Sequence, residues 1–287
     1  MRTTLAGQTM RSLHRFIEPA HFLARAEPFL RAAEVENVLM LGICSPGGSG
    51  RFDDSCYLAT AEEDQAVVAC ALRTPPYSAV LTRADREALE LLVTDLAGKY
   101  QDLPAAAGPE PAIRDFAELW TARTGATARP AVRMRVFEAR HVLQPPLPSG
   151  AFRMATEADL ATATQWAEAF FDETGLNDPS DASDVAREQI RRGSLFIWED
   201  SRPVSMAAWA GRTGQTVRVN SVYTSPEHRG RGYASACVAF LTQRLLDEGL
   251  TSCCIYTDLA NPTSNKIYQA IGYRPVADVT EYRFEAG

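Results

Sequence analysis

A strand, a short glycine-rich loop and the start of a helix follow one another in Val222–Ala234, and this segment constrains the fold more than any other. It reads Val-Tyr-Thr-Ser-Pro-Glu-His-Arg-Gly-Arg-Gly-Tyr-Ala. The first turn of a helix has backbone N–H groups without partners and carries the positive end of the helix dipole. Gly230 and Gly232 lack a Cβ, so an anion can approach the backbone closely. The segment therefore predicts a cradle for a pyrophosphate group.

Two common phosphate-binding motifs do not fit this cradle. A P-loop continues with Gly-Lys-Ser/Thr, and a dinucleotide-binding fingerprint has a different glycine spacing. The chain instead resembles the GNAT superfamily of acyl-CoA-dependent N-acyltransferases, whose signature Arg/Gln-x-x-Gly-x-Gly/Ala is matched by Arg229, Gly232 and Ala234. A later stretch, Asn261-x-x-Ser-Asn-x-x-Tyr followed by Gly-Tyr, resembles the second conserved region of that family. The resemblance covers residues 151–285.

The resemblance implies a binding role for several groups of residues. The backbone of Val222, Tyr223 and Thr224 would pair with the pantetheine arm of coenzyme A, as an added strand does. The backbone N–H groups of the cradle would hold the pyrophosphate, and they belong to Arg229, Gly230, Arg231, Gly232, Tyr233, Ala234 and Ser235. The side-chain amides of Asn261 and Asn265 would contact the cofactor, although Asn261 could also cap a helix.

Acyl transfer to an amine requires a base, donors at the oxyanion and an acid for the thiolate. Tyr268 lies where the family often has its acid, and the alternative is a core aromatic on an amphipathic helix. Candidates for the base are Glu173, at the end of a helix, and Asp258, at the end of a strand, each acting directly or through water. A backbone N–H within Val222–Thr224 would stabilise the oxyanion. We interpret His228 as a solvated loop residue.

The stretch Gln144-Pro-Pro-Leu-Pro-Ser-Gly cannot continue a helix or a central strand and predicts a domain boundary. The expected domains are residues 1–145, an accessory or degenerate copy, and residues 150–287, the acyltransferase domain. The fold class is α/β (α+β), with a mixed, mostly antiparallel central sheet flanked by helices and two tandem GNAT-like domains. The first block repeats the element order of the second weakly, either through duplication or through coincidence. It reads Leu-Thr-Arg-Ala-Asp-Arg over 81–86, without glycine, so it should not bind the cofactor in this way.

Composition excludes several other classes of protein. The net charge is −7, whereas a nucleic-acid-binding protein needs a basic face. No apolar run reaches the ~18–20 residues of a membrane span, and no secretion signal is apparent. The sequence therefore predicts a cytoplasmic protein. The six cysteines show no metal-binding spacing, so we expect free thiols and no metal site.

The combined expectation is an N-acetyltransferase that moves an acetyl group from acetyl-CoA, as acyl donor, to a small-molecule or peptide amine. The alternative is an acyl-CoA sensor or scaffold that keeps the fold without turnover. An acidic helical region would attract a cationic amine or would merely be a solvated face; it contains Glu168, Asp172, Glu173, Asp178, Asp181 and Asp184. The first block is expected to be a wall of the acceptor site or a scaffold for a homodimer.

Overall fold

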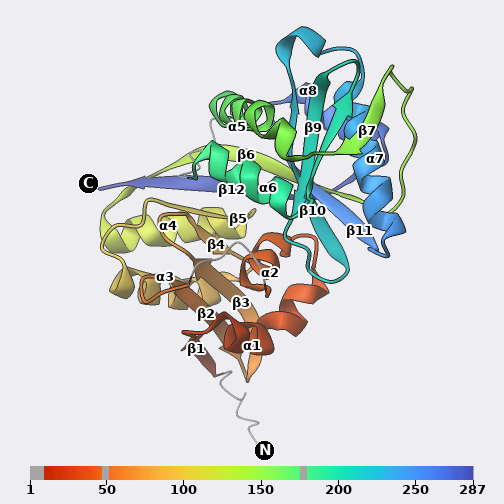
Figure 1. The fold of residues 1–287 in the computed structure, drawn as a ribbon. Helices are drawn as coiled ribbons and strands as arrows, with labels where there is room; N and C mark the ends of the chain where they lie inside the picture. Colours follow the sequence, from red (N-terminus) through yellow and green to blue (C-terminus); the bar gives the residue numbers. More distant parts are fainter. Residues whose placement is uncertain (1–9, 47–51, 175–179, 287) are drawn as a thin grey trace, which may run out of the picture. The chain divides into compact units, whose positions relative to one another are not determined.

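The computed structural model describes residues 10–46, 52–174 and 180–286. Both halves of the chain contain strands and helices (Figure 1). The first half contains β1 (Arg11–Arg15), α1 (Pro19–Ala32), α2 (Val38–Cys44), β2 (Tyr57–Glu63), β3 (Ala66–Arg73), β4 (Ala79–Leu81), α3 (Arg86–Lys99), β5 (Ala105–Pro109), α4 (Ala112–Thr124) and β6 (Thr127–Ala139). The second half contains β7 (Ala151–Met154), the 3-10 turn η1 (Glu157–Asp159), α5 (Leu160–Thr174), α6 (Ala182–Arg191), β8 (Leu195–Glu199), β9 (Pro203–Ala210), β10 (Thr216–Thr224), the 3-10 turn η2 (Pro226–His228), α7 (Tyr233–Asp247), β11 (Ser252–Asp258), α8 (Pro262–Ala270) and β12 (Arg274–Glu285).

The two halves repeat one order of elements. Apart from the short 3-10 turns, each half runs strand, two helices, three strands, helix, strand, helix and strand. Of the two explanations left open by the sequence, this shared order favours duplication over coincidence. The repeat could not be seen in full from the sequence, where β1, α1 and α2 were not predicted.

The strands that the structure describes form one sheet in the order β1-β2-β3-β4-β5-β12-β6-β11-β10-β9-β8-β7. The pairs β4–β5 and β10–β11 are parallel, and most of the others are antiparallel. The fold class predicted from the sequence is therefore confirmed.

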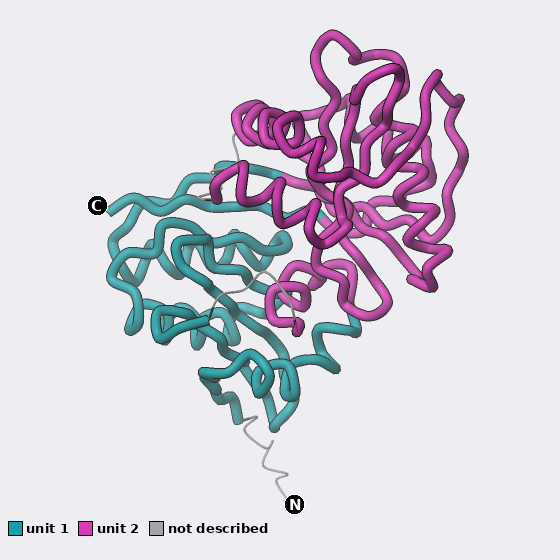
Figure 2. Tube along the Cα trace, in the orientation of Figure 1, with its two compact units in different colours: residues 1–33, 50–133, 278–287 teal, residues 34–49, 134–277 magenta. Residues whose placement is uncertain are grey.

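The chain divides into two compact units, drawn in teal and magenta in Figure 2. Unit 1 comprises Met1–Ala33, Gly50–Arg133 and Asp278–Gly287, and unit 2 comprises Glu34–Ser49 and Met134–Ala277.

The sequence predicted two contiguous domains, 1–145 and 150–287, whereas these units are interleaved along the chain. The reason is strand pairing. Val279–Arg283 of β12 pair antiparallel with Pro109–Ala105 of β5, within unit 1. Met134–Ala139 of β6 pair antiparallel with Asp258–Cys253 of β11, within unit 2. Proline and glycine composition marks a break in local structure and carries no information about such long-range pairing.

Unit 1 has its own hydrophobic core, built from β2, β3, β4 and the apolar faces of α3 and α4. The C-terminal strand contributes Phe284, whose ring lies 6.3 Å from that of Phe116 and 5.8 Å from that of Trp120. Aromatic side chains bury large apolar areas and pack favourably at such separations. The end of β12 therefore contributes to the stability of unit 1.

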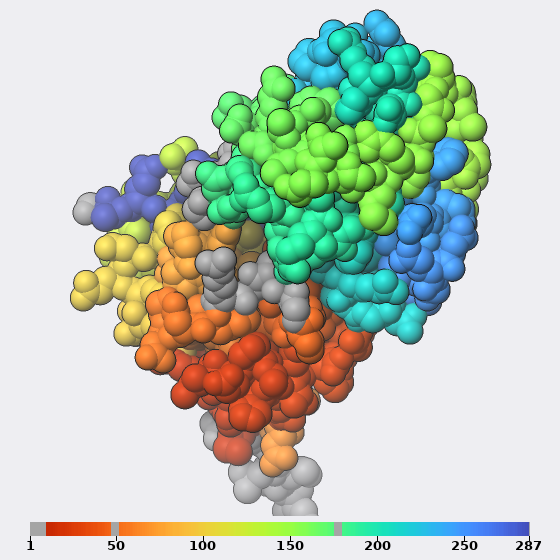
Figure 3. Space-filling view, viewed as in Figure 1, coloured from red at the N-terminus to blue at the C-terminus, as the bar shows by residue number. Residues whose placement is uncertain are grey.

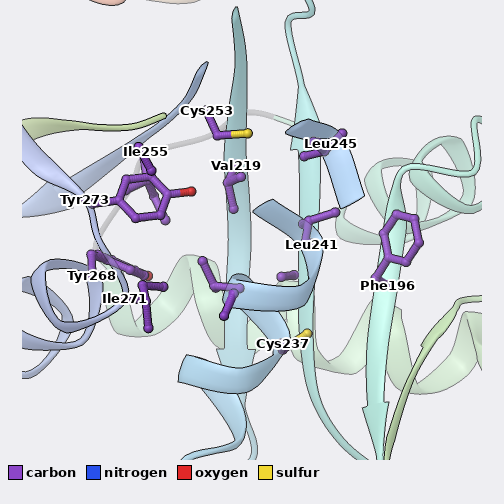
Figure 4. Close-up of a cluster of buried hydrophobic side chains, with 14 of the residues drawn as sticks. Phe196, Val219, Cys237, Leu241, Leu245, Cys253, Ile255, Tyr268, Ile271 and Tyr273 are labelled. Atoms are coloured by element: carbon purple, nitrogen blue, oxygen red, sulfur yellow. The ribbon is translucent and has the colours of Figure 1, made fainter. Parts of the chain in front are cut away.

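Unit 2 has apolar side chains on both faces of its part of the sheet. On one face α7 and α8 pack against β10 and β11, and the cluster includes Val219, Leu241, Leu245 and Ile255 (Figure 4). On the other face α5 and α6 cover β8, β9 and β10, through a second cluster centred on Trp166. These helices lie in front of the strands in Figure 1, and green side chains of this part of the chain are seen there in the space-filling view of Figure 3.

A capping box lies just before α5, at the turn η1. In this box the side chains of Thr156 and Asp159 each accept from the other residue's backbone. Arg153 donates two hydrogen bonds of 2.8 Å to the Asp159 carboxylate and, with the backbone N–H of Thr156, keeps the pKa of that carboxyl below its usual value. Such caps satisfy helix donors and typically contribute about 1 kcal/mol. The box fixes where α5 begins and so helps to place Glu173 near its other end.

Candidate functional site

A bulge in β10 creates the first component of the site. Asn220 pairs with Ala208 and Tyr223 with Met206, so two residues of β10, Ser221 and Val222, lie opposite a single residue of β9. Ser221 has a φ of 48°, a conformation that side chains other than glycine rarely adopt. Bulges interrupt the ladder of hydrogen bonds and are common beside active sites.

At the same point β10 separates from its parallel neighbour. The pairing with β11 covers Thr216–Val219 and Ser252–Ile255. The end of β10, with Val222–Thr224, lies beyond this paired stretch. Its edge on the β11 side can therefore accept an extended ligand as an added strand. This geometry supports the predicted role of the backbone of Val222, Tyr223 and Thr224.

The glycine cradle follows directly. Gly230 and Gly232 have φ values of 77° and 85°, and a Cβ built on either would meet nothing within 4 Å. Glycine is needed for the backbone conformation, and the space in front of it is open. Gly232 is the N-cap of α7 and provides no side-chain cap. The N–H groups of Tyr233, Ala234 and Ser235 precede the first i→i−4 bond, which joins Ala236 to Gly232. The residues present thus fit an anionic group.

The first arginine of the cradle is held by a carboxylate. Arg229 donates from Nη2 to both oxygens of Glu173, at 2.7 and 2.8 Å, and from Nε to the carbonyl oxygen of Thr224, at 3.0 Å. Its guanidinium lies 5.4 Å from the ring centre of Tyr223, whose hydroxyl donates to Glu173 at 3.4 Å. The structure therefore connects the end of α5 with the cradle. The candidate base Glu173 forms an ion pair with the residue predicted to receive phosphate.

His228 is not a solvated loop residue, and that expectation was wrong. Its side chain is buried, with 8% of the residue's surface exposed. The ring nitrogens lie 2.7 Å from Ser225 Oγ and 3.3 Å from Arg202 Nη2. Serine and arginine on the two ring nitrogens fix the orientation of the imidazole under the cradle. No sequence pattern pointed to Arg202, which lies in the turn between β8 and β9.

Asp200 is a second residue that sequence reasoning missed. Its carboxylate accepts from the Tyr233 hydroxyl at 2.5 Å and from the Ser149 hydroxyl at 2.7 Å. These two donors, Tyr233 first, keep the pKa of the Asp200 carboxyl below its usual value. The contact anchors the side chain of Tyr233, the first residue of α7.

Three polar residues predicted around the cofactor organise the turn between β11 and α8. Asn261 caps α8 by accepting from the backbone N–H of Ser264 at 3.0 Å. Asn265 donates to the carbonyl oxygens of Asp258 and Asn261, at 2.9 and 2.7 Å, and accepts from the Thr257 hydroxyl at 2.6 Å. Asp258 is exposed, and its carboxylate accepts from the backbone N–H of Ala260. Their side chains thus have structural partners, and a direct role toward a cofactor or an amine stays a prediction.

Tyr268 lies in the core of unit 2, with 6% of its surface exposed (Figure 4). Its ring centre is 6.0 Å from that of Tyr273. Burial raises the pKa of the Tyr268 hydroxyl above its usual value, with a smaller opposing effect of a hydrogen bond to Ser264. The phenol is therefore protonated at neutral pH. Tyr268 thus packs in the core, which was one of the two alternatives. Its role as the general acid stays a prediction.

The equivalent loop of unit 1 has a different chemistry. The N-cap of α3 is Asp85, whose carboxylate accepts from the backbone N–H of Ala88 at 2.9 Å. Arg11 donates to the same carboxylate at 2.5 and 2.8 Å and keeps the pKa of Asp85 below its usual value. A fixed negative charge at this helix start takes the place that a phosphate would need. The structure thus gives a stronger reason than missing glycine for expecting no phosphate there.

The acidic region at the end of α5 is partly used for structure. Asp181 caps α6 by accepting from the backbone N–H groups of Ser183 and Asp184, at 2.8 and 3.2 Å. Asp184 accepts from Arg187 at 3.2 Å. Asp178 lies outside the described residues. A helix cap and an ion pair account for part of the charge without any ligand.

The described residues 10–46, 52–174 and 180–286 contain no helix that combines the length and the apolar composition of a membrane span. No group of three or more His, Cys, Asp or Glu side chains there is placed to hold a metal ion. The cysteines are free, as the sequence predicted.

Comparison with known proteins fits this geometry. The model of the Acetyltransferase (GNAT) family matches residues 160–273, the segment that runs from α5 through the cradle to the end of α8. Residues 160–273 form a GNAT acetyltransferase domain. A search of curated proteins finds no match.

Solved structures show that the likeness in fold extends over nearly the whole chain. A Drosophila protein superposes with a TM-score of 0.67 at 12% identity, covering 96% of this chain and 98% of its own. A GNAT-family acetyltransferase from Colwellia psychrerythraea gives 0.58 at 12% identity, covering 96% and 100%. A tandem GNAT protein from the clavulanic acid biosynthesis pathway gives 0.58 at 13% identity, covering 97% and 99%. These matches confirm the tandem GNAT-like fold predicted from the sequence.

Proposed function

We propose that this protein is a cytoplasmic N-acetyltransferase that uses the site in unit 2 to transfer an acetyl group from acetyl-CoA to an amine. The observation that carries the proposal is the uncapped start of α7 behind two glycines with positive φ and open space before them. The matched family supports the acetyl donor. The acceptor would be a small-molecule or peptide amine.

The chain supplies a group for each requirement of the reaction. Acetyl-CoA would provide a thioester whose carbonyl carbon bonds to the amine nitrogen while the C–S bond breaks and the amine loses a proton. The bulged end of β10 would align the pantetheine arm, and a backbone N–H within Val222–Thr224 would donate to the carbonyl oxygen. Glu173, or Asp258 through water, would take the proton, and Tyr268 would protonate the thiolate.

A non-catalytic acyl-CoA sensor is the second candidate, and a specific observation favours it. The Glu173 carboxylate is paired with Arg229. The amides of Asn261 and Asn265 are engaged in the β11–α8 turn. The Tyr268 ring is in the core. A protein that only bound acyl-CoA could keep all of these contacts without turnover.

Thiol release from acetyl-CoA distinguishes the two candidates. The assay uses the full chain with glucosamine, spermidine, a lysine-containing peptide and phenethylamine as acceptors. If the protein is an acetyltransferase, thiol release should depend on at least one of these amines and should saturate as the concentration of that amine rises. CoA binding without amine-dependent release from any of the four would support the sensor instead.

Unit 1 is proposed to serve the acceptor or the assembly rather than the cofactor. Its α3 start is occupied by the Asp85 carboxylate, which supports the absence of a second phosphate site. Self-association as a homodimer is part of the proposal, and sedimentation of the full chain tests it. A monomeric mass across the assay concentrations would remove the homodimer.

A further inference from the structure

Asn220 lies on β10, immediately before the bulge. Its side-chain oxygen Oδ1 is buried, and among the residues that the structure describes it is the one buried side-chain nitrogen or oxygen without a hydrogen-bond partner. A buried acceptor left unpaired destabilises the fold, because it has lost its hydrogen bonds to water without replacement. Groups of this kind are rare in folded proteins and call for an explanation, such as a ligand that supplies the missing donor.

The position of Asn220 in the sheet agrees with such a role. It is the last residue of β10 that pairs in regular register with β9 before the bulge, and it follows directly the last residue that pairs with β11. The donor-binding edge, Val222–Thr224, begins two residues later. Asn220 is therefore next to the place that the acyl group of acetyl-CoA would reach if the pantetheine arm lay along that edge.

The face of the sheet shows which reactant Asn220 can meet. Residues paired directly across two strands point to the same face. Asn220 pairs with Ala208, which belongs to the cluster under α5 and α6. Val217 and Val219 point to the opposite face and pack against α7, whose start forms the cradle. Asn220 thus faces away from the phosphate cradle, toward the side of the sheet that is covered by α6 and by α5, which carries Glu173.

The bulge beside Asn220 is held in place from that same side. Gln189 of α6 donates from Nε2 to the Ser221 hydroxyl at 3.0 Å. Ser221 has the unusual positive φ. A residue kept in a sparsely populated conformation persists only where surrounding contacts support it. The backbone around Asn220 is therefore held by its pairing with β9 and by the contact of α6 with the next residue, Ser221.

The chemistry of Oδ1 selects the partner. A carbonyl oxygen accepts hydrogen bonds only, so it requires a donor. The thioester group itself has no donor, and the amide N–H groups of the pantetheine arm would pair with the backbone of Val222–Thr224, whereas the attacking amine brings N–H groups of its own. We propose that Asn220 Oδ1 accepts a hydrogen bond from the acceptor amine and directs its lone pair at the thioester carbonyl. This inference rests on the proposed function.

A preference for primary amines follows. A neutral primary amine has two N–H groups: one hydrogen bonds to Asn220 while the other leaves to the base as the C–N bond forms. A secondary amine has one N–H group and cannot satisfy both. The protein should therefore favour a primary amine over its N-methyl derivative, and part of that preference should depend on Asn220.

The test compares Asn220→Leu with wild type, using the amine of the panel that is turned over best and its N-methyl derivative. Leucine has a similar volume and no acceptor. We expect KM for the primary amine to rise about three- to tenfold, in line with the loss of one hydrogen bond, and the primary-to-secondary ratio of kcat/KM to fall. CoA affinity should stay unchanged. The melting temperature should stay the same or rise, because an unpaired buried polar group is removed.

Two further variants complete the design. Asn220→Asp keeps an acceptor oxygen and should retain the preference for the primary amine, whereas Asn220→Ala should lose it and replaces the leucine variant if that one does not fold. Ser221→Ala is the control variant, because it removes the hydrogen bond from Gln189 at the residue next to Asn220. Wild-type KM and a wild-type ratio in Asn220→Leu or Asn220→Ala would overturn the assignment. Because wild-type turnover is measured in the same assay, failure of the proposed function is recognised separately, as absence of any amine-dependent release.

Discussion

Tyr268 is the residue for which a chemical role and a packing role lead to different measurements. Burial keeps the phenol protonated, so it can donate to a thiolate as charge develops on sulfur. General acids typically contribute ~10²–10⁴-fold, and a thiolate is a moderately good leaving group, so Tyr268→Phe should lower kcat at least about tenfold. CoA affinity should change little, because the ring remains. A lower melting temperature with wild-type kcat would show that Tyr268 only packs.

Glu173 can be tested against its own ion pair. Its carboxylate is paired with Arg229 and would compete with a phosphate for that guanidinium, so Glu173→Gln should bind CoA as tightly as wild type or a few-fold more tightly. If Glu173 is the base, kcat should fall by about a hundredfold in the same variant. Asp172→Asn, with the same change of charge on the neighbouring residue, is the control. Weaker CoA binding together with wild-type kcat would mean that the pair only shapes the cradle.

At the scale of an element, the two ends of α7 provide a matched pair of glycines. Gly232 begins the helix and Gly249 follows its end, with φ values of 85° and 94°, and a Cβ on either meets nothing within 4 Å. Alanine at either position should cost a similar ~1–2 kcal/mol of backbone strain.

Only Gly232→Ala should weaken CoA binding. A Cβ there would keep phosphate from the amides, and charged hydrogen bonds of roughly 1.5–3 kcal/mol each correspond to about ten- to hundredfold in affinity. Calorimetric titration and thermal melting of both variants separate binding from stability. Equal losses of affinity at both glycines would indicate a general effect of backbone strain and would contradict the assignment of the phosphate cradle to Gly232.

The elements around the site also show what a sequence can predict. The glycines, the helix after them and the Thr156 capping box follow from local rules of backbone conformation, and the structure contains all three. The contacts of Arg229 with Glu173, of Tyr233 with Asp200 and of His228 with Arg202 join residues far apart in the chain. No spacing rule reveals such contacts, because they depend on which strands become neighbours.

At the scale of the whole molecule, the interleaving of the units predicts which unit a substitution in the last strand, β12, destabilises. Phe284 is near the C-terminus, yet it packs on Phe116 and Trp120 of unit 1. Phe284→Ala should cost roughly 3 kcal/mol, as large-to-small changes in a core do. Hydrogen exchange should show lost protection in β5 and α4 and little change at the start of α7. Loss confined to unit 2 would contradict the described pairing of β12 with β5.

We propose that the chain has one acyl-CoA site, at the start of α7 in unit 2. The uncapped glycine start of α7 fits an anion, whereas Asp85 already occupies the start of α3 in unit 1. Calorimetric titration of the full chain with CoA tests this most directly. We predict one site per chain. A titration that shows two equivalent sites, or no binding, would contradict a single acyl-CoA site at the start of α7.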